Sequence, residues 1–365
     1  MEKLFTSESV TEGHPDKMCD QISDAILDEH LKQDKNSRVA IETLVKNDLV
    51  ILAGEISSNA KVNLAETARN VIKEIGYEYN PKIIINVTKQ SQEISQGVNK
   101  EENKEQGAGD QGMMFGYACN ETDNYLPLPI YLAHKLTKKL TELRKSKEIN
   151  YIMPDGKSQV TVKYHESKPN KIQTIVLSTQ HNEIDRNILE RDILEKVIKP
   201  VCKTYLDENT KFLINPTGSF IKGGPEADAG VTGRKIIVDT YGGMGKHGGG
   251  AFSGKDPSKV DRSAAYAARF IAKNLVANKL CQRCEVGLSY AIGVAEPVSI
   301  FIDSFGTSEL SEEKLIKIVK ENFPLKPSEI IEYFDLRKPI YKQTSTNGHF
   351  TNEDFAWEKI IKINH

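Results

Sequence analysis

Residues 13–57 read GHPDKMCDQISDAILDEHLKQDKNSRVAIETLVKNDLVILAGEIS, and this stretch contains the unit from which we predict the fold. Apolar residues at helical spacing, with a proline at the first position, predict a helix over residues 15–33. Residues 39–45 and 49–56 are predicted to be strands, and the Asn-Asp pair between them is typical of a tight hairpin turn. The local building block is therefore a helix next to a pair of strands.

The rest of the chain continues this alternation. We expect helices over residues 63–75, 129–145, 185–198, 258–278 and 311–322. We expect strands over residues 82–88, 159–164, 172–177, 211–214, 285–294 and 298–302. The strand pair with its helix recurs about three times without a sequence repeat, which predicts an α+β fold of mixed sheets, each covered by helices.

Composition excludes several classes of protein. A chain of 365 residues is too long for one ordinary core, so two or three domains are expected. The 49 basic and 51 acidic side chains leave a net charge of −2, whereas a protein that binds a nucleic-acid backbone normally carries a basic excess. No apolar run is long enough for a membrane helix, and the first residues have no apolar region of a secretory signal.

The cysteines favour a reducing compartment. There are 5 of them, an odd number in a long chain, which predicts a cytoplasmic protein without disulfides. Cys281 and Cys284 form a single CxxC pair with no second pair or nearby histidines. Because a zinc site needs four ligands, we interpret the pair as structural or incidental thiols.

Glycine is concentrated in one part of the chain. Residues 218–254 hold 12 of the 25 glycines, and residues 219–262 contain seven Lys or Arg and five Asp or Glu. Some of these glycines belong to ordinary turns, but closely spaced backbone N–H groups also bind anions. The mixture of cations and carboxylates predicts a polyphosphate bound together with a metal ion.

Residues 249–256, GGAFSGKD, nearly match a P-loop. Asp256 occupies the position where a P-loop has Ser or Thr to ligate Mg²⁺, and the preceding residues are glycine-rich rather than a buried strand. A P-loop ATPase or kinase is therefore the alternative hypothesis, and a non-catalytic nucleotide-binding protein is a third.

Three other stretches each allow a functional and a structural interpretation. Residues 7–17, SESVTEGHPDK, place His14 and Lys17 where they could meet a phosphate and Asp16 where it could hold a metal, or they form an ordinary helix N-cap. Residues 153–159 look foremost like a Pro-Asp-Gly turn between strands. Two strand carboxylates, Glu42 and Glu55, are most simply explained by an exposed strand face. The single tryptophan, Trp357, is expected to pack near the C-terminus.

Taken together, the motifs GHPDK (residues 13–17), GAGDQG (107–112) and GG…HGGGAFSGKD (242–256) resemble the bacterial type of the S-adenosylmethionine synthetase (methionine adenosyltransferase) family. The similarity extends over residues 4–350. It implies a transferase that combines methionine with ATP to give S-adenosylmethionine, and that cleaves the displaced tripolyphosphate to pyrophosphate and phosphate before release.

The residue types make chemical sense of that reaction. Methionine sulfur carries no proton, so its attack on the ribose C5′ needs no general base. The difficulty is the departure of a whole tripolyphosphate, so catalysis should come from positioning and from cations that stabilise growing negative charge.

The resemblance also implies roles for individual residues. The catalytic residues are expected to be His14, Lys157, Arg234, Lys235 and Lys255. The ATP-binding residues are expected to be His14, Asp155, Gly156, Lys157, Ser219, Phe220, Asp228, Arg234, Lys235, Ala251 and Lys255. The methionine-binding residues are expected to be Glu55, Gln96, Asp228 and Lys259. The metal ligands are expected to be Asp16 and Asp261 for a pair of Mg²⁺ ions and Glu42, with help around Ser253, for one K⁺.

Within these groups the resemblance is more specific. His14 and Lys157 would meet the oxygen that joins C5′ to the phosphates, Asp155 would reach the ribose, and Phe220 would stack on adenine. Residues 96–106 would form a lid that gates the site and excludes water.

The chain departs from the family pattern at a few positions. Ser219, Met153 and Lys246 stand where arginine is usual, Lys222 replaces an apolar residue, and Cys281 has no expected counterpart. None of these changes removes a catalytic group, although Ser219 could weaken nucleotide binding if the usual contact is made through the side chain.

For the architecture, the resemblance implies three similar α+β domains related by pseudo-threefold symmetry. The sequence blocks are residues 1–98, the lid loop 99–107, residues 108–224 and residues 225–365, with segments that interleave between compact bodies. The implied assembly is a homotetramer made of two tight dimers, with active sites shared between the two subunits of a dimer.

Overall fold

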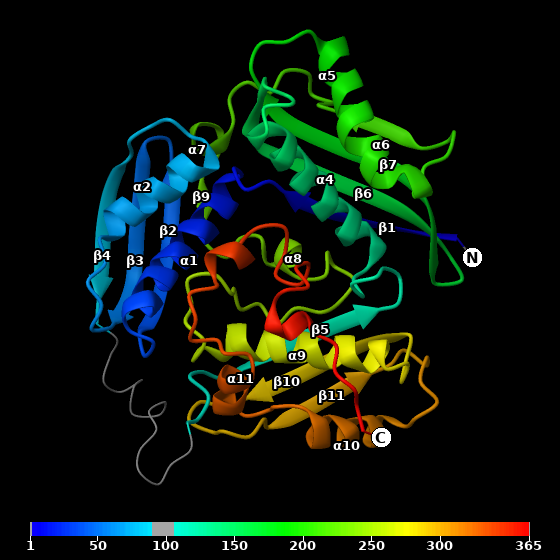
Figure 1. Ribbon diagram of the computed structural model, residues 1–365. Coiled ribbons are helices and arrows are strands. Elements are labelled where there is room, and N and C mark those ends of the chain that lie inside the picture. Colours follow the sequence, from blue (N-terminus) through cyan, green and yellow to red (C-terminus); the bar gives the residue numbers. More distant parts are fainter. Residues whose placement is uncertain (1, 90–105, 365) are drawn as a thin grey trace.

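The computed structural model describes residues 2–89 and 106–364. Three β-sheets, each with its own helices, are arranged around the centre of the molecule (Figure 1). Strands from distant parts of the chain meet in every sheet. Each sheet also has its own cluster of buried apolar side chains. The α+β class with three similar domains is therefore confirmed.

The first sheet contains the predicted hairpin. Its strands, in order, are β4 (Lys82–Thr88), β3 (Leu49–Ser57), β2 (Arg38–Lys46) and β9 (Gly230–Val231). The helices that cover it are α1 (Pro15–Gln33) and α2 (Leu64–Ile75). The predicted helix over residues 15–33 is confirmed, and Gly76 ends α2 in the left-handed conformation with φ 108°.

The second sheet combines the N-terminus with the middle of the chain. Its strands, in order, are β1 (Glu2–Val10), β6 (Ile152–His165), β7 (Lys168–His181) and β8 (Lys211–Ile214). Its helical segments are α4 (Leu128–Lys145), α5 (Arg186–Ile193), a π-helical turn (Leu194–Ile198) and α6 (Lys199–Cys202). The predicted helix over residues 185–198 is thus α5 extended by the π-helical turn.

The third sheet belongs mainly to the C-terminal part. Its strands, in order, are β11 (Ser299–Asp303), β10 (Arg283–Tyr290) and β5 (Gly112–Cys119). Its helices are α9 (Val260–Ala277), α10 (Glu312–Asn322) and α11 (Pro327–Tyr333). The glycine-rich region carries two one-turn helices, α7 (Gly224–Ala227) and α8 (Ile236–Asp239). As expected, Trp357 is fully buried and stacks on Tyr266 with ring centroids 3.9 Å apart.

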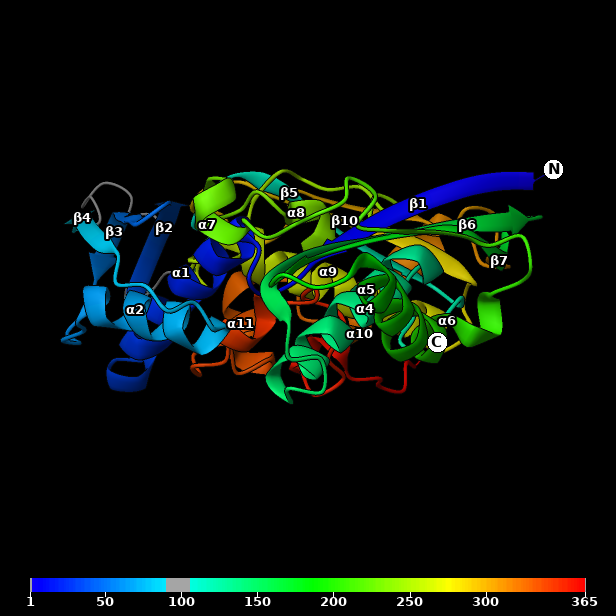
Figure 2. The same ribbon diagram turned by 90° about the horizontal axis from the view of Figure 1, so that it is seen from above.

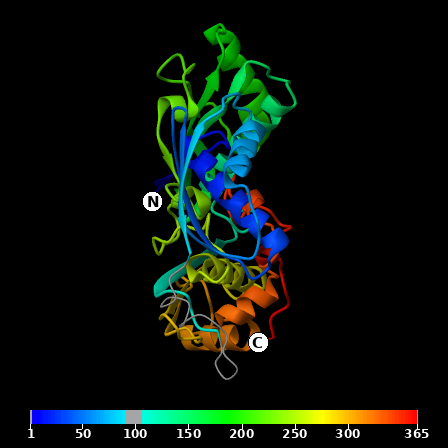
Figure 3. The same ribbon diagram turned by 90° about the vertical axis from the view of Figure 1, so that its left-hand side faces the viewer.

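The helices and the strands occupy opposite sides of the molecule. Figures 2 and 3 show the three sheets along one side and the helices that cover them along the other. The side chains of Glu42 and Glu55 lie on the uncovered, exposed side of the first sheet, so the expected exposed strand face is observed.

Three sequence predictions need correction or lie outside the description. The strands β1 and β5 were not among the predicted strands. Residues 153–159 are not a turn between strands but lie within β6, where the register to β7 shifts between Ile152 and Gly156. The predicted lid, residues 96–106, lies outside the described residues except for Gln106.

A column of four buried aspartates on α1 ties the N-terminal sheet to the C-terminal half of the chain. The column repeats every four residues: Asp16, Asp20, Asp24 and Asp28. Each accepts hydrogen bonds from backbone N–H groups of later residues, at Val231, Gly233, Gly254 and, for the last aspartate, both Tyr341 and Lys342. These contacts fix the glycine-rich loops against the start of the chain.

One member of this column forms a fully buried ion pair. Arg262 donates from both terminal nitrogens to the two carboxylate oxygens of Asp24 at 2.7 and 2.9 Å, and both side chains have 0% exposure. Loss of one partner from such a pair leaves an uncompensated buried charge.

We therefore expect Arg262→Met to lower the free energy of unfolding by about 3–5 kcal/mol, because Asp24 stays buried without its cation. Urea denaturation followed by circular dichroism measures this loss. Lys199→Met is the control, since the exposed Lys199–Glu195 pair should contribute less than about 1 kcal/mol. Equal midpoints for the two variants would contradict the proposed importance of the column.

Candidate active site

The start of α1 carries the first group of predicted residues. His14 is the N-cap of the helix, and its Nδ1 accepts a hydrogen bond from the Asp16 backbone N–H at 3.2 Å. Burial, followed by the nearby cations Lys235 and Lys157, lowers the pKa of His14 from 6.5 to about 3. His14 is therefore a neutral ring at neutral pH, with Nε2 free to carry a proton and donate it in a hydrogen bond.

Asp16 gathers the cations of the glycine-rich region. Lys235 Nζ donates to Asp16 Oδ2 at 2.5 Å, the Val231 N–H donates to Oδ1 at 3.0 Å, and Arg234 Nε lies 3.8 Å from Oδ1. Burial opposes ionisation of this carboxyl, but the Lys235 and Val231 hydrogen bonds outweigh it and lower the pKa of Asp16. The structure thus joins His14, Asp16, Arg234 and Lys235 in one cluster.

A bulge in β6 brings further residues to this cluster. On β6, residues 153–155 stand opposite a single residue of β7, so the strand is locally distorted before Gly156. Asp155 accepts a hydrogen bond from the Gly224 N–H at 2.8 Å, and burial raises its pKa to about 6. The charge of Lys157 acts on both His14 and Asp155, and Asp228 acts on Asp155, so these predicted residues also lie together.

Two further predicted ATP-binding residues, Ser219 and Phe220, lie in the loop that follows β8. Phe220 is half-buried, its N–H donates to His181 Nε2 at 3.1 Å, and its carbonyl accepts from the His181 N–H at 3.0 Å. Ser219 is exposed beside it. His181 ends β7 and therefore holds this loop at the end of the strand.

A second cluster forms around the other half of the glycine-rich region. Lys255 Nζ donates to Asp261 Oδ2 at 2.7 Å, and both side chains are about one-quarter exposed, at 26%. A Cβ at Gly250 would lie 2.3 Å from the Asp261 carboxylate, so the glycine loop is held directly against this carboxylate. Ala251 in turn contacts Gly233, which links the loop to the segment that carries Arg234.

The remaining predicted residues lie around this second cluster. An isolated bridge joins Ala40 to Lys255, so the loop runs beside β2 near Glu42. Glu55 is opposite Ala40 on β3. Lys259 donates to the buried carboxylate of Asp256 at 2.5 Å, and Gln96 lies outside the described residues.

Two sequence interpretations are wrong. Lys17 does not face a phosphate site: it has 0% exposure and pairs with Asp20 and Asp239. The P-loop alternative also fails, because no strand precedes residues 249–256 and the Asp256 carboxylate is a buried acceptor for the Val39 and Ser258 N–H groups.

No cluster of three or more His, Cys, Asp or Glu side chains suited to a metal ion occurs in the part of the chain that the structure describes. All five cysteines, among them Cys281 and Cys284, are free and buried. In the described ranges, no helix has the length and apolarity to cross a membrane.

Sequence reasoning missed the residue that ties the loops of the first cluster together. The Tyr77 hydroxyl donates to the Gly13 carbonyl at 2.8 Å, and a Cβ at Gly224 would lie 2.2 Å from the same hydroxyl oxygen. A Cβ at Gly13 would in turn lie 2.4 Å from Pro154 Cβ. The only local signal was a tyrosine directly after the glycine that ends α2.

Comparisons with known proteins agree with this architecture. Three family models match the chain in order: the S-adenosylmethionine synthetase N-terminal domain over residues 2–101, central domain over 105–220 and C-terminal domain over 222–359. The S-adenosylmethionine synthase of Clostridium botulinum is 54% identical over 384 residues, which covers 100% of this chain and 98% of that protein. That of Staphylococcus epidermidis is 54% identical over 385 residues, 99% and 96% of the two chains, and that of Clostridium tetani 53% identical over 384 residues, 100% and 98%.

The three family models and the full-length relatives therefore define an adenosyl-transferring enzyme built from three α+β domains. More narrowly, the chain belongs to the S-adenosylmethionine synthetase family. It is a methionine adenosyltransferase that makes S-adenosylmethionine from methionine and ATP, so the expected family and enzyme class are confirmed and the non-catalytic alternative is excluded.

We predict that Tyr77→Phe lowers kcat about fivefold with little change in melting temperature, because it removes a hydrogen bond of about 1 kcal/mol that orients the Gly13–His14 turn. Steady-state kinetics and a thermal melt measure the two quantities. Tyr79→Phe is the matched control, since the Tyr79 hydroxyl only approaches Met18 Sδ at 3.8 Å. Equal kcat in both variants would show that the Tyr77 hydroxyl does not position the site.

Proposed function

We propose that the enzyme joins methionine sulfur to C5′ of ATP, displaces the entire tripolyphosphate, and then hydrolyses it to pyrophosphate and phosphate. One observation carries this proposal: Lys157, Arg234 and Lys235 come from distant segments and converge on His14 and Asp16 at the start of α1. A tripolyphosphate gains negative charge as it leaves, and preorganised cations stabilise this charge.

His14 and Lys157 are assigned to the bridging oxygen between C5′ and the phosphates. Because the pKa of His14 is lowered to about 3, its ring is neutral and can donate one hydrogen bond without adding a charge. Lys157 is exposed on β6, so its ammonium can reach a bound ligand. His14 would therefore act as a neutral hydrogen-bond donor, and Lys157 as a cation, at the bond that breaks.

The paired charges suggest how Mg²⁺–ATP is bound. Asp16 is paired with Lys235, and Asp261 with Lys255. A lone carboxylate at each place fits Mg²⁺, which typically uses one or two protein carboxylates together with substrate phosphates. The two bound Mg²⁺ ions would neutralise phosphate charge. Lys235, Lys255 and Arg234 would then release their carboxylates and bind the tripolyphosphate.

A K⁺ site between Glu42 and Ser253 also fits the residues present. The Ser253 hydroxyl is buried without a hydrogen-bond partner among the described residues. The Ile41 N–H donates to the Gly254 carbonyl at 3.0 Å, so Ser253 lies beside the strand that carries Glu42. A hydroxyl without a partner and a nearby carboxylate are oxygen ligands for a hard cation.

The other substrate contacts follow the same logic. We assign Asp155 and Gly156 to the ribose. We assign Phe220, together with Ser219 and Ala251, to adenine. We assign methionine to Glu55, Gln96, Asp228 and Lys259. The half-buried Phe220 ring supports stacking, since an exposed aromatic face can accept a purine.

We propose that a second copy of the chain covers the open face of the sheets and completes the active site. Apolar side chains on the outward faces support this: Leu4 is 55% exposed, Ile84 42%, Met113 58% and Phe301 40%. Glu42 and Glu55 lie on the same open side. A tetramer built from two such dimers in the cytoplasm extends the proposal, and five free cysteines support a reducing compartment.

The domain blocks 1–98, 99–107, 108–224 and 225–365 remain a proposal about how the chain divides in sequence. They differ from the three sheets because β1, β5 and β9 each lie in a sheet built mainly from another block. The three family models have boundaries close to these blocks.

We expect Lys157→Ala to slow formation of the sulfonium product in a single turnover about 10²- to 10³-fold while ATP affinity changes little, because the ammonium acts mainly on charge that develops in the transition state. Rapid quench measures the chemical step and calorimetry without methionine measures ATP binding. Lys163→Ala, on the same strand, is the control. An equal loss in both quantities would assign Lys157 to ground-state binding instead.

Removal of the proposed K⁺ ligands should raise the K⁺ concentration needed for half-maximal activity about tenfold in Ser253→Ala and in Glu42→Gln, because each change removes one oxygen ligand. Initial rates over a K⁺ titration at constant ionic strength measure this effect. Glu66→Gln, an exposed carboxylate on α2, should leave the K⁺ dependence unchanged. The K⁺ proposal fails if both ligand variants respond like this control.

A further inference from the structure

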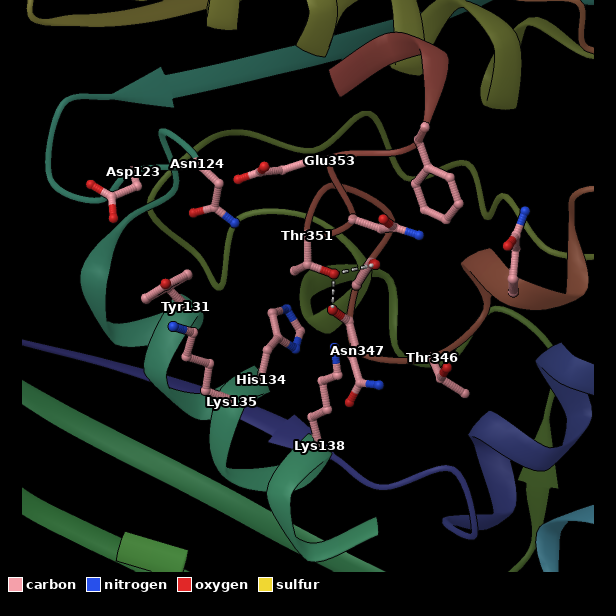
Figure 4. Close-up of a pocket in the computed structure, with 14 residues that line it drawn as sticks. Asp123, Asn124, Tyr131, His134, Lys135, Lys138, Thr346, Asn347, Thr351 and Glu353 are labelled. Atoms are coloured by element: carbon pink, nitrogen blue, oxygen red, sulfur yellow. Dashed lines mark hydrogen bonds between the residues drawn. The ribbon is translucent and has the colours of Figure 1, made fainter. Parts of the chain in front are cut away.

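A cavity of about 480 Å³ lies away from both clusters, on the helical side of the molecule. Figure 4 shows its lining from α4 and from two loops, one that follows β5 and one in the C-terminal segment near Asn347 and Thr351. Its volume lies in the range of cavities that hold small molecules. None of its lining residues has a role in the reaction proposed above.

The floor of the cavity is polar and built from buried groups. His134 is 3% exposed, and its Nδ1 is 2.8 Å from the Ser9 hydroxyl. Asn124, which is 6% exposed, adds a buried amide. The base of the cavity is therefore buried and polar.

The wall next to the histidine is a fixed loop. The Thr351 hydroxyl donates to the Asn347 carbonyl at 2.8 Å and to the Gly348 carbonyl at 3.3 Å, as drawn in Figure 4. A Cβ at Gly348 would lie 2.6 Å from His134 Nε2, so only glycine lets the loop approach the ring this closely. The cavity is therefore shaped by packing rather than by loose side chains alone.

The rim carries charges of both signs that do not pair. Lys135 and Lys138 come from α4, and Asp123 and Glu353 come from the two loops. Within the described part of the chain none of these four side chains forms an ion pair, and the Lys135 ammonium lies 4.4 Å from the centre of the Tyr131 ring. In Figure 4 Asp123 and Glu353 lie along one side of the cavity, and Lys135 and Lys138 lie along the other, on α4 together with His134.

We propose that this cavity binds a small zwitterion of the α-amino-acid class. The carboxylate of such a molecule would face Lys135 and Lys138, and its ammonium would face Asp123 and Glu353. A simple anion would meet the two carboxylates of the rim, and a simple cation would meet the two lysines, so only a zwitterion matches both sides. The rings of Tyr131 and Phe355 line the same cavity and offer apolar surface for the side chain of the amino acid.

The test is calorimetry with the full-length chain in the absence of ATP and methionine. L-Glutamine and L-phenylalanine serve as zwitterionic probes, and inorganic phosphate and tetramethylammonium serve as the anion and the cation. We expect a zwitterion to bind with roughly millimolar affinity and to bind about tenfold more weakly to Lys138→Gln and to Glu353→Gln. Lys139→Gln and Asp354→Asn are matched controls, because each changes the neighbouring residue, which does not line the cavity.

The proposal is overturned if neither amino acid binds at about 20 mM, where a millimolar site would be close to saturation. It is also overturned if phosphate or tetramethylammonium binds and Lys138→Gln or Glu353→Gln weakens that binding, or if the cavity variants and the controls bind the amino acid equally well. S-Adenosylmethionine synthesis is measured separately on the same variants and should be unchanged. A failure of the proposed reaction mechanism would therefore leave the binding result intact.

Discussion

The burial of four carboxylates along one helix is the constraint on which the rest of the structure depends. A buried carboxylate is costly unless hydrogen bonds and cations compensate it. On α1 the compensation comes from backbone N–H groups between Val231 and Lys342 and from the guanidinium of Arg262. The helix can therefore be stable in this position only when the glycine-rich loops and the C-terminal segment are in place.

This dependence explains why the glycines gather in one part of the chain. Gly254 must offer its N–H to Asp24, and a Cβ there would lie 2.0 Å from the Ile41 carbonyl oxygen. Gly230 lies equally close to the backbone of Pro15. The loops that hold the predicted cations thus pack closely, backbone to backbone, against α1 and β2. This packing fixes the backbone positions of Arg234, Lys235 and Lys255.

Local signals predicted much of the fold, and long-range contacts decided the rest. Caps and spacing gave α1, α2 and the β2–β3 hairpin. In contrast, β1 buries Ser7 and Ser9, whose hydroxyls bind the Gly242 carbonyl and His134, so its inward face does not look apolar in the sequence. The Pro-Asp-Gly residues of β6 have turn chemistry, but contacts with Gly13 and Gly224 hold them in a bulged strand. The resemblance named the site residues, whereas their pairing across more than 200 positions, as between Asp16 and Lys235, required the fold.

The depth of each ion pair separates structural charges from those that can take part in chemistry. Lys17 resembles a phosphate ligand in sequence, yet it is fully buried between Asp20 and Asp239 and cannot leave them without exposing two carboxylates to an apolar interior. Lys255 and Asp261 are each 26% exposed, and Arg234 is 55% exposed beside Asp16. Charges at this depth are already partly hydrated, so the exchange of partners proposed for Arg234 and Lys255 costs less than it would for Lys17. All four aspartates of α1 are buried, and the partly exposed charges lie instead on the later loops, at Arg234 and Lys255.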